Sequence, residues 1–98
     1  MPEKSSEMDS GMKTCHLQDV STLQRFFTEI AQAFAFPRGF EADMDGLWDA
    51  LIEAEGPLRL VWERPGTTRD ALGEEYWMLL EILADAVAER GDFELVLR

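Results

Sequence analysis

The chain has 98 residues and a formal net charge of −11, from nine Lys and Arg against 20 Asp and Glu. This length suffices for one domain with a single modest core, and the hydrophobic content of 46% indicates a folded globule rather than a disordered chain. The acidic balance argues against nucleic acid as a direct ligand, because phosphate binding needs clusters of Lys and Arg, and it favours a basic partner instead.

The start of the chain is polar and predicts a flexible tail over residues 1–12, ahead of a domain over residues 13–98. The tail lacks the apolar core of a signal peptide, and no later run reaches the ~18 apolar residues of a membrane-spanning helix. The single cysteine, Cys15, has no partner for an internal disulfide, which fits a reducing compartment. We therefore expect a cytoplasmic protein that does not contact a membrane.

The domain begins with a weak strand, predicted for residues 13–17. Ser21 is a typical helix N-cap, and Gln24 three residues later would complete a capping box. The apolar residues that follow keep helical spacing as far as the break at Pro37. The sequence therefore predicts the first helix for residues 21–35.

The rest of the domain alternates helices and strands. An acidic helix is predicted for residues 41–54 and a strand for residues 58–62, followed by a loop at 65–68, where Pro, Gly and two Thr occur together. The longest helix is predicted for residues 69–90 and a closing strand for residues 93–97. Strands separated by helices favour a parallel sheet with right-handed crossovers. The predicted fold class is α/β, with a small three-stranded parallel sheet packed by three to four helices.

The second helix carries a concentrated negative charge. Its apolar residues recur with the period of one helix face: Met44, Leu47, Trp48 and Leu51. Asp45 and Asp49 lie one turn apart on a neighbouring face, where like charges destabilise an isolated helix by roughly 0.2–0.5 kcal/mol. Residues 41–55 contain six Asp and Glu and no Lys or Arg. Such an edge is typical of a surface that meets a positively charged partner.

The segment from Phe36 to Leu51, and within it Asp45-Gly46-Leu47-Trp48-Asp49, resembles the signature region of the barstar family, the intracellular inhibitors of the ribonuclease barnase. The resemblance extends over about residues 13–98 in element order and length, and it includes the strand that ends in Trp62. It implies a three-stranded parallel sheet packed by helices, the fold that periodicity also predicts.

The resemblance implies a binding site as well. In the family, two aspartates of this helix enter the active site of the ribonuclease where RNA phosphates would bind, and Asp45 and Asp49 match them by position. Asp85 matches an acidic residue of the third helix, with a one-residue deletion allowed, and should be exposed. Gly39 and Phe40 stand where the family has paired tyrosines before the helix. These five residues are the expected partner-binding set.

By resemblance, the chain is an antitoxin-like or immunity-like inhibitor and not an enzyme, without cofactor or metal, and its partner is a basic extracellular-type ribonuclease. Departures from the family pattern favour a cognate ribonuclease other than barnase. The tyrosine pair is replaced, a glycine becomes Glu41, an asparagine becomes Asp43, and the loop at 54–56 is shorter and lacks an aromatic residue. The same departures motivate an alternative: a barstar-fold interaction module for another basic protein, such as a different toxin.

Plainer interpretations apply to several of these residues. Acids in a first helical turn stabilise the helix dipole by roughly 0.3–1 kcal/mol, which accounts for Asp43 but not for Asp49. Trp48 is expected to be a core residue. Trp77 and Met78 lie off the apolar stripe of the third helix, and we expect them to be partly buried rather than to form an exposed patch.

Two other functions have little support. Residues 41–49 match the first nine positions of an EF-hand calcium loop, but the helical stripe contradicts a loop conformation. His16 is the single histidine, and Cys15 beside it would point to the opposite face of a strand, so the two do not make a nucleophile–base pair. The sequence also has no glycine-rich phosphate loop and no Cys/His cluster with zinc spacing.

Overall fold

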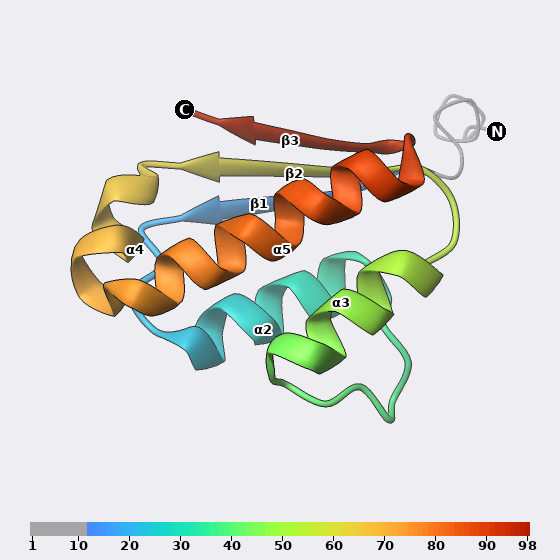
Figure 1. The fold of residues 1–98 in the computed structure, drawn as a ribbon, viewed down its shortest axis with the longest axis horizontal. Coiled ribbons are helices and arrows are strands. Elements are labelled where there is room, and N and C mark those ends of the chain that lie inside the picture. The colour runs from blue at the N-terminus through green and yellow to red at the C-terminus, as the bar shows by residue number, and fades with distance from the viewer. Residues whose placement is uncertain (1–11) are drawn as a thin grey trace, which may run out of the picture.

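The computed structural model describes residues 12–98, which form a sheet and a layer of helices on one of its faces (Figure 1). Three parallel strands make the sheet, in the order β1 (Lys13–Gln18), β2 (Leu58–Glu63) and β3 (Phe93–Leu97). The helices are α2 (Leu23–Ala33), α3 (Met44–Glu53), α4 (Pro65–Leu72) and α5 (Glu74–Arg90). The predicted α/β class with a three-stranded parallel sheet is confirmed.

Helices α2 and α5 pack on one face of the sheet, α3 packs against α5, and α4 lies beyond the carboxyl ends of the strands (Figure 1). Successive residues of a strand point to opposite faces. In the register of β1 with β2, Cys15 aligns with Leu60 and Leu17 with Trp62, and all four side chains are buried. The strand periodicity therefore places the core on the helical side.

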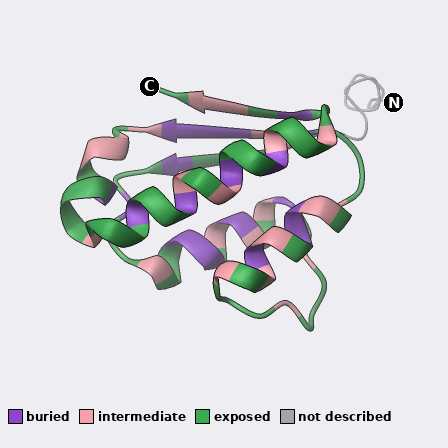
Figure 2. Ribbon diagram, viewed as in Figure 1, coloured by how far each residue is buried: buried purple, intermediate pink, exposed green. Residues whose placement is uncertain are grey.

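The core fills the space between the sheet and the helices (Figure 2). Trp62 of the central strand has its ring centroid 5.5 Å from that of Phe26 in α2 and 5.5 Å from that of Tyr76 in α5. Aromatic pairs at this separation add to the burial of apolar area. The largest fully buried side chains include Trp62, Phe26, Phe34, Leu17, Ile30, Leu47, Leu51, Leu58, Leu60, Leu79 and Leu83.

The first helix starts later than predicted. Thr22, in an extended conformation, is its N-cap, and the hydroxyl of Thr22 accepts a hydrogen bond from the backbone N–H of Arg25 at 3.1 Å. The prediction of Ser21 as the cap is therefore wrong. Both residues can cap a helix, and the choice depends on which backbone is extended at the helix start.

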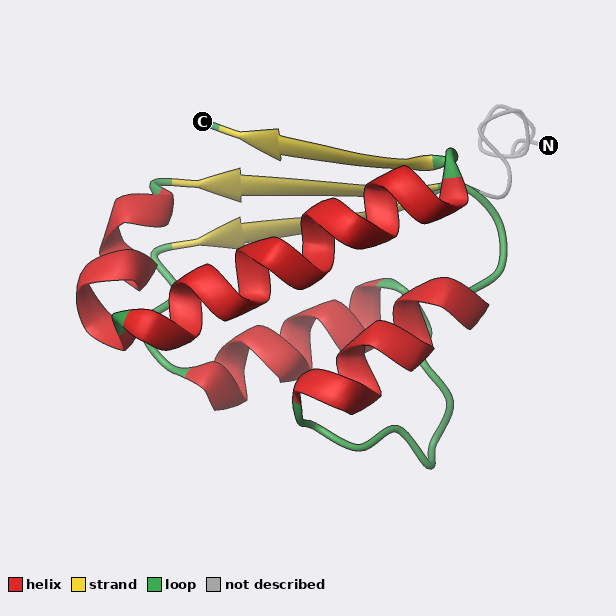
Figure 3. Ribbon diagram, viewed as in Figure 1, coloured by secondary structure: helices red, strands yellow, loops and turns green. Residues whose placement is uncertain are grey.

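The predicted loop at residues 65–68 is wrong, because these residues form the first turn of α4. Pro65 occupies the first helical position, where its fixed φ suits a helix and its missing N–H is not needed. The predicted helix 69–90 is two helices, separated by a turn at Gly73 with φ of 62° (Figure 3). Gly91, with φ of 82°, ends α5 as a left-handed C-cap.

The structure bears only partly on the predicted tail and on the predicted lack of a membrane-spanning helix. The predicted tail lies almost entirely in residues 1–11, outside the described residues. Within residues 12–98, no helix has both the length and the apolar character needed to span a membrane.

Candidate protein-binding site

Helix α3 is held on the domain by one face. Its buried and half-buried side chains are Met44, Leu47, Trp48, Ala50, Leu51 and Ile52. This confirms the predicted stripe, with Trp48 half-buried against the core, and adds Ala50 and Ile52. The opposite face leaves Asp45 and Asp49 exposed.

Asp43 serves the amino end of α3 rather than its exposed face. Its carboxylate accepts a hydrogen bond from the N–H of Gly46 at 2.7 Å, so Asp43 is the N-cap. The predicted start at residue 41 is therefore wrong, and the helix begins at Met44. An Asp cap stabilises a helix by typically ~1 kcal/mol, which accounts for this carboxylate without a partner.

Gly46 lets the preceding loop close over the first turn of α3. A Cβ at this position would collide with the backbone carbonyl of Glu41 and would lie 3.1 Å from Oδ1 of Asp43. Because backbone cannot yield as a flexible side chain does, only glycine fits here without a shift of the loop. The loop is thus fixed against the helix that carries Asp45 and Asp49.

The loop and α3 enclose a small acidic hollow of about 250 Å³. Asp45, Asp49 and Glu53, at successive turns of α3, line one side, and Gly39 and Phe40 line the other. The structure therefore brings together four of the five predicted residues. Glu53 was not predicted, although its place two turns beyond Asp45 puts it on the same helix face.

Phe40 also packs against the domain. Its ring centroid lies 5.0 Å from that of Phe36 and 6.2 Å from that of Phe27 in α2. Gly39, in contrast, has open space where a Cβ would be. The loop thus offers one anchored ring and one small residue beside the carboxylates.

Asp85 lies outside the hollow. It is exposed on α5, as predicted, but it does not line the hollow, and it belongs instead to the helix that runs beside α3 (Figure 1). Trp77 and Met78 on the same helix are 56% and 46% exposed. The prediction of partial burial is wrong for these two, because α5 buries the face that carries Tyr76 and Leu79.

Among residues 12–98, the carboxylates of α3 and α5 form no ion pair. Within residues 12–98, the ion pairs use carboxylates from other parts of the chain: Asp19, Glu29, Glu63, Asp70, Asp92 and Glu94. None of these lies within residues 41–55 or 74–89. Six of the arginines in residues 12–98 are paired with those other carboxylates, and the carboxylates of α3 and α5 take part in none of these ion pairs.

Arg90 fixes the carboxyl end of α3 from the end of α5. Its guanidinium donates to the carbonyl oxygens of Ala54 at 2.8 Å and Gly56 at 2.7 Å, and it pairs with Asp92 at 2.7 Å. Sequence reasoning missed this residue, because a contact between positions more than thirty residues apart leaves no local pattern. The helix that carries the hollow is thus held at both ends.

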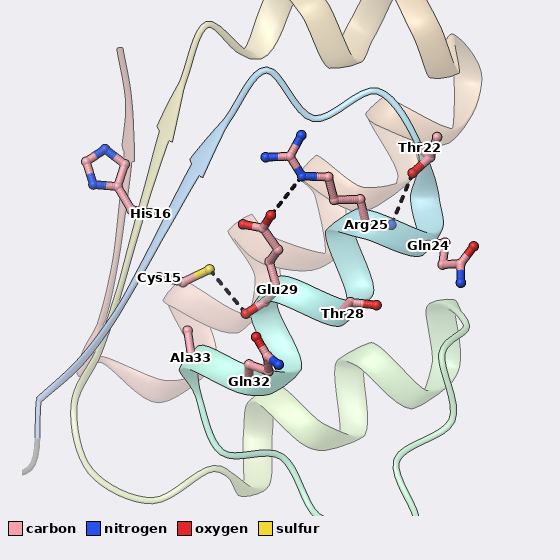
Figure 4. Close-up of a pocket in the computed structure, with 9 residues that line it drawn as sticks. All are labelled: Cys15, His16, Thr22, Gln24, Arg25, Thr28, Glu29, Gln32 and Ala33. Carbon is pink, nitrogen blue, oxygen red and sulfur yellow. Dashed lines mark hydrogen bonds and ion pairs between the residues drawn. The ribbon is translucent and has the colours of Figure 1, made fainter.

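A larger hollow, of about 720 Å³, lies between β1 and α2 (Figure 4). Its charged side chains pair with each other, since Nε of Arg25 donates to Glu29 at 2.7 Å. Cys15 is buried there, and burial raises the pKa of its thiol to about 12. His16 lies on the other face of the strand, 2.8 Å from Glu63. Cys15 and His16 therefore point apart, as predicted.

The EF-hand pattern at residues 41–49 does not form a loop of that kind, because the segment is helical from Met44 onward. Across residues 12–98, no three His, Cys, Asp or Glu side chains are grouped so that they could hold a metal ion.

Fold and site together define a small two-layer α/β protein that exposes a carboxylate-lined helix beside a fixed loop. The family model described as Barstar (barnase inhibitor) matches residues 12–98. That match covers nearly the whole chain, which therefore belongs to the barstar family. No curated protein matches the chain.

Proposed function

We propose that the chain inhibits a basic, guanyl-specific-type ribonuclease by covering its active site with α3. Asp45 and Asp49 would stand where RNA phosphates bind, and Asp85 would extend the acidic contact from α5. The observation that carries the proposal is the hollow in which Asp45 and Asp49 lie together, with no basic residue of the chain paired to them within residues 12–98. Membership of the barstar family supports the same partner class.

The physical basis is neutralisation of opposite charges at an interface that excludes water. A ribonuclease active site must attract phosphates, so it presents Arg, Lys and His side chains that suit carboxylates. The net charge of −11 would speed association with such a partner by long-range steering. The proposed inhibitor has no catalytic activity and needs no cofactor. Its binding domain would begin near residue 13, and it would act in the cytoplasm.

The experiment that tests the proposal is inhibition of RNA hydrolysis by a panel of secreted guanyl-specific ribonucleases, with affinities from calorimetry. Asp49→Ala should weaken binding most, by about 2–5 kcal/mol or about 30- to 4,000-fold. This is the range for truncating one partner of a desolvated charge pair, for which the barnase–barstar complex is itself a reference case. Asp70→Ala, which removes an exposed carboxylate from α4, is the matched control and should leave the affinity unchanged. Equal affinity of Asp49→Ala and the unmodified chain would show the mechanism to be wrong.

A barstar-fold module for another basic protein, such as a different toxin, is the second candidate. Gly39 and Phe40 favour it, because they replace the tyrosine pair of the family. No inhibition of any ribonuclease in the panel, by a chain that is folded, would support this candidate over the first.

A further inference from the structure

The outer face of α5 combines exposed apolar side chains with unpaired carboxylates. Trp77 and Met78 follow directly after the buried Tyr76, so the helix turns them away from the core. Exposure of 56% for a tryptophan and 46% for the methionine that follows it leaves two large apolar side chains in water. Large exposed aromatic residues of this kind are typical anchors of protein interfaces.

Trp77 is held in place although it is exposed. Its ring centroid lies 4.9 Å from that of Tyr76, in an edge-to-face arrangement, and Tyr76 in turn contacts Trp62 in the core. The tryptophan therefore loses little conformational freedom when a partner covers it, which favours binding.

The charges on this face have a single sign. The exposed acidic residues of α5 are Glu74, Glu75, Glu81, Asp85 and Glu89. None of them forms an ion pair with another residue of the described chain, 12–98. The sole basic residue of α5 is Arg90, whose side chain is only 10% exposed and is paired with Asp92.

We infer that the face formed by Trp77, Met78, Glu81 and Asp85 binds a basic protein surface in which Arg or Lys side chains surround an apolar one. A second copy of this chain does not suit it, because two such faces would bring carboxylates together. A cationic side chain over the exposed ring of Trp77 gains a cation–π contact as well as the charge of Glu81. The inference rests on the proposed function, because Asp85 lies on this face. It adds Trp77 and Met78 of α5 as contact residues, beyond the carboxylates of α3.

The test uses a synthetic amphipathic peptide of Lys and Leu as the probe, titrated into the isotope-labelled chain and followed by amide chemical shifts. The largest shifts should fall within residues 74–85, and a matched peptide of Glu and Leu should cause none. Trp77→Ala should weaken binding of the Lys/Leu peptide about five- to tenfold. Leu97→Ala removes another exposed apolar side chain, 45% exposed, from the end of β3 and should leave the affinity unchanged.

Two results would overturn the inference. One is equal weakening by Trp77→Ala and Leu97→Ala, which would mean nonspecific apolar contact. The other is a peptide that shifts α3 instead and is lost with Asp49→Ala, a result that leaves the proposed ribonuclease inhibition standing. Thermal unfolding of each variant shows that it is still folded at the temperature of the titration, which excludes loss of the fold as the cause.

Discussion

The guanidinium of Arg90 donates a hydrogen bond of 2.7 Å to the carbonyl oxygen of Leu51. This bond joins the last turn of α5, which packs on the sheet, to the last turn of α3, which carries the acidic hollow. The last carbonyl groups of a helix have no partners within it, and a positive charge there also suits the helix dipole. Arg90 therefore satisfies the end of α3 and fixes its position on the domain.

Replacement of Arg90 should destabilise the domain and loosen α3. Arg90→Met removes the charge and leaves carbonyl groups without donors, so we expect the free energy of unfolding to fall by about 2–4 kcal/mol. The stability of Arg90→Lys should lie between that of the unmodified chain and that of Arg90→Met, because an ammonium group cannot reproduce the fork of the guanidinium. Urea unfolding measures the loss, and amide hydrogen exchange should show the greatest loss of protection at the end of α3.

The control for Arg90 is Arg69→Met. Arg69 is an exposed residue of α4, and its Nε lies 3.5 Å from Oδ1 of Asp70, a long and solvent-exposed ion pair. Its loss should change stability by less than about 0.5 kcal/mol. Similar losses at the two positions would contradict the role of Arg90 in holding α3.

Gly46→Ala should disturb the acidic site without a change in charge. The new Cβ would push the backbone of Glu41 away from α3, at a cost of about 1–3 kcal/mol in the free energy of unfolding. Amide shifts should change along the loop at 39–43, and the affinity for the ribonuclease or other partner should fall. Gly39→Ala, where a Cβ meets nothing within 4 Å, should leave stability unchanged within about 0.5 kcal/mol. An unchanged loop in Gly46→Ala would show that the close approach is not required.

The sequence predicted those parts of the fold that depend on local periodicity. The stripe through Leu47 and Leu51 reports a helix face that the tertiary structure then buries. The errors occur where a local pattern has two outcomes. Pro65 is compatible with a loop or with the first turn of a helix, and only the rest of the fold decides between them.

The candidate site was predictable to a similar degree and for similar reasons. The spacing of Asp45 and Asp49 places both on one helix face, whatever the rest of the fold does. Trp77 lies off the apolar stripe of α5, so the local pattern was compatible with its exposure, although partial burial was expected. The requirement for Gly46 depends on the path of a loop five residues earlier, and the role of Arg90 depends on a distant helix end.

The free energy of unfolding should decrease as the pH is lowered into the acid range, in part because of the pair of Asp19 and Arg64. Two hydrogen bonds from Arg64, of 2.8 and 2.7 Å, lower the pKa of Asp19 below its ordinary value. The unfolded chain then binds the proton more readily than the native one, so the contribution is complete above the ordinary pKa and is lost as the pH falls through the lowered one. Glu63, whose pKa is lowered chiefly by the hydrogen bond with His16, contributes in the same direction.

The measurement is the free energy of unfolding by urea from neutral pH to below about pH 4, the ordinary range of carboxyl groups. Asp19→Asn and Arg64→Gln should each reduce the steepness of the loss, because each removes the same interaction. The double variant should show no further reduction beyond either single one. Additive effects of the two substitutions would show that the pair is not the cause.

Cys15 should be unreactive in the native protein. Its pKa, raised to about 12 chiefly by burial and further by Glu29, leaves almost no thiolate at pH 8, and the thiolate is the form that attacks a disulfide reagent. The thiol hydrogen is also directed to the backbone carbonyl of Glu29, with Sγ 3.8 Å from the oxygen. Reaction with an aromatic disulfide should therefore be slow in buffer, accelerate with urea as the domain opens, and be immediate in the unfolded chain. Rapid, complete reaction in buffer alone would contradict this prediction, because it would mean that the reagent reaches the Cys15 thiol in the native protein.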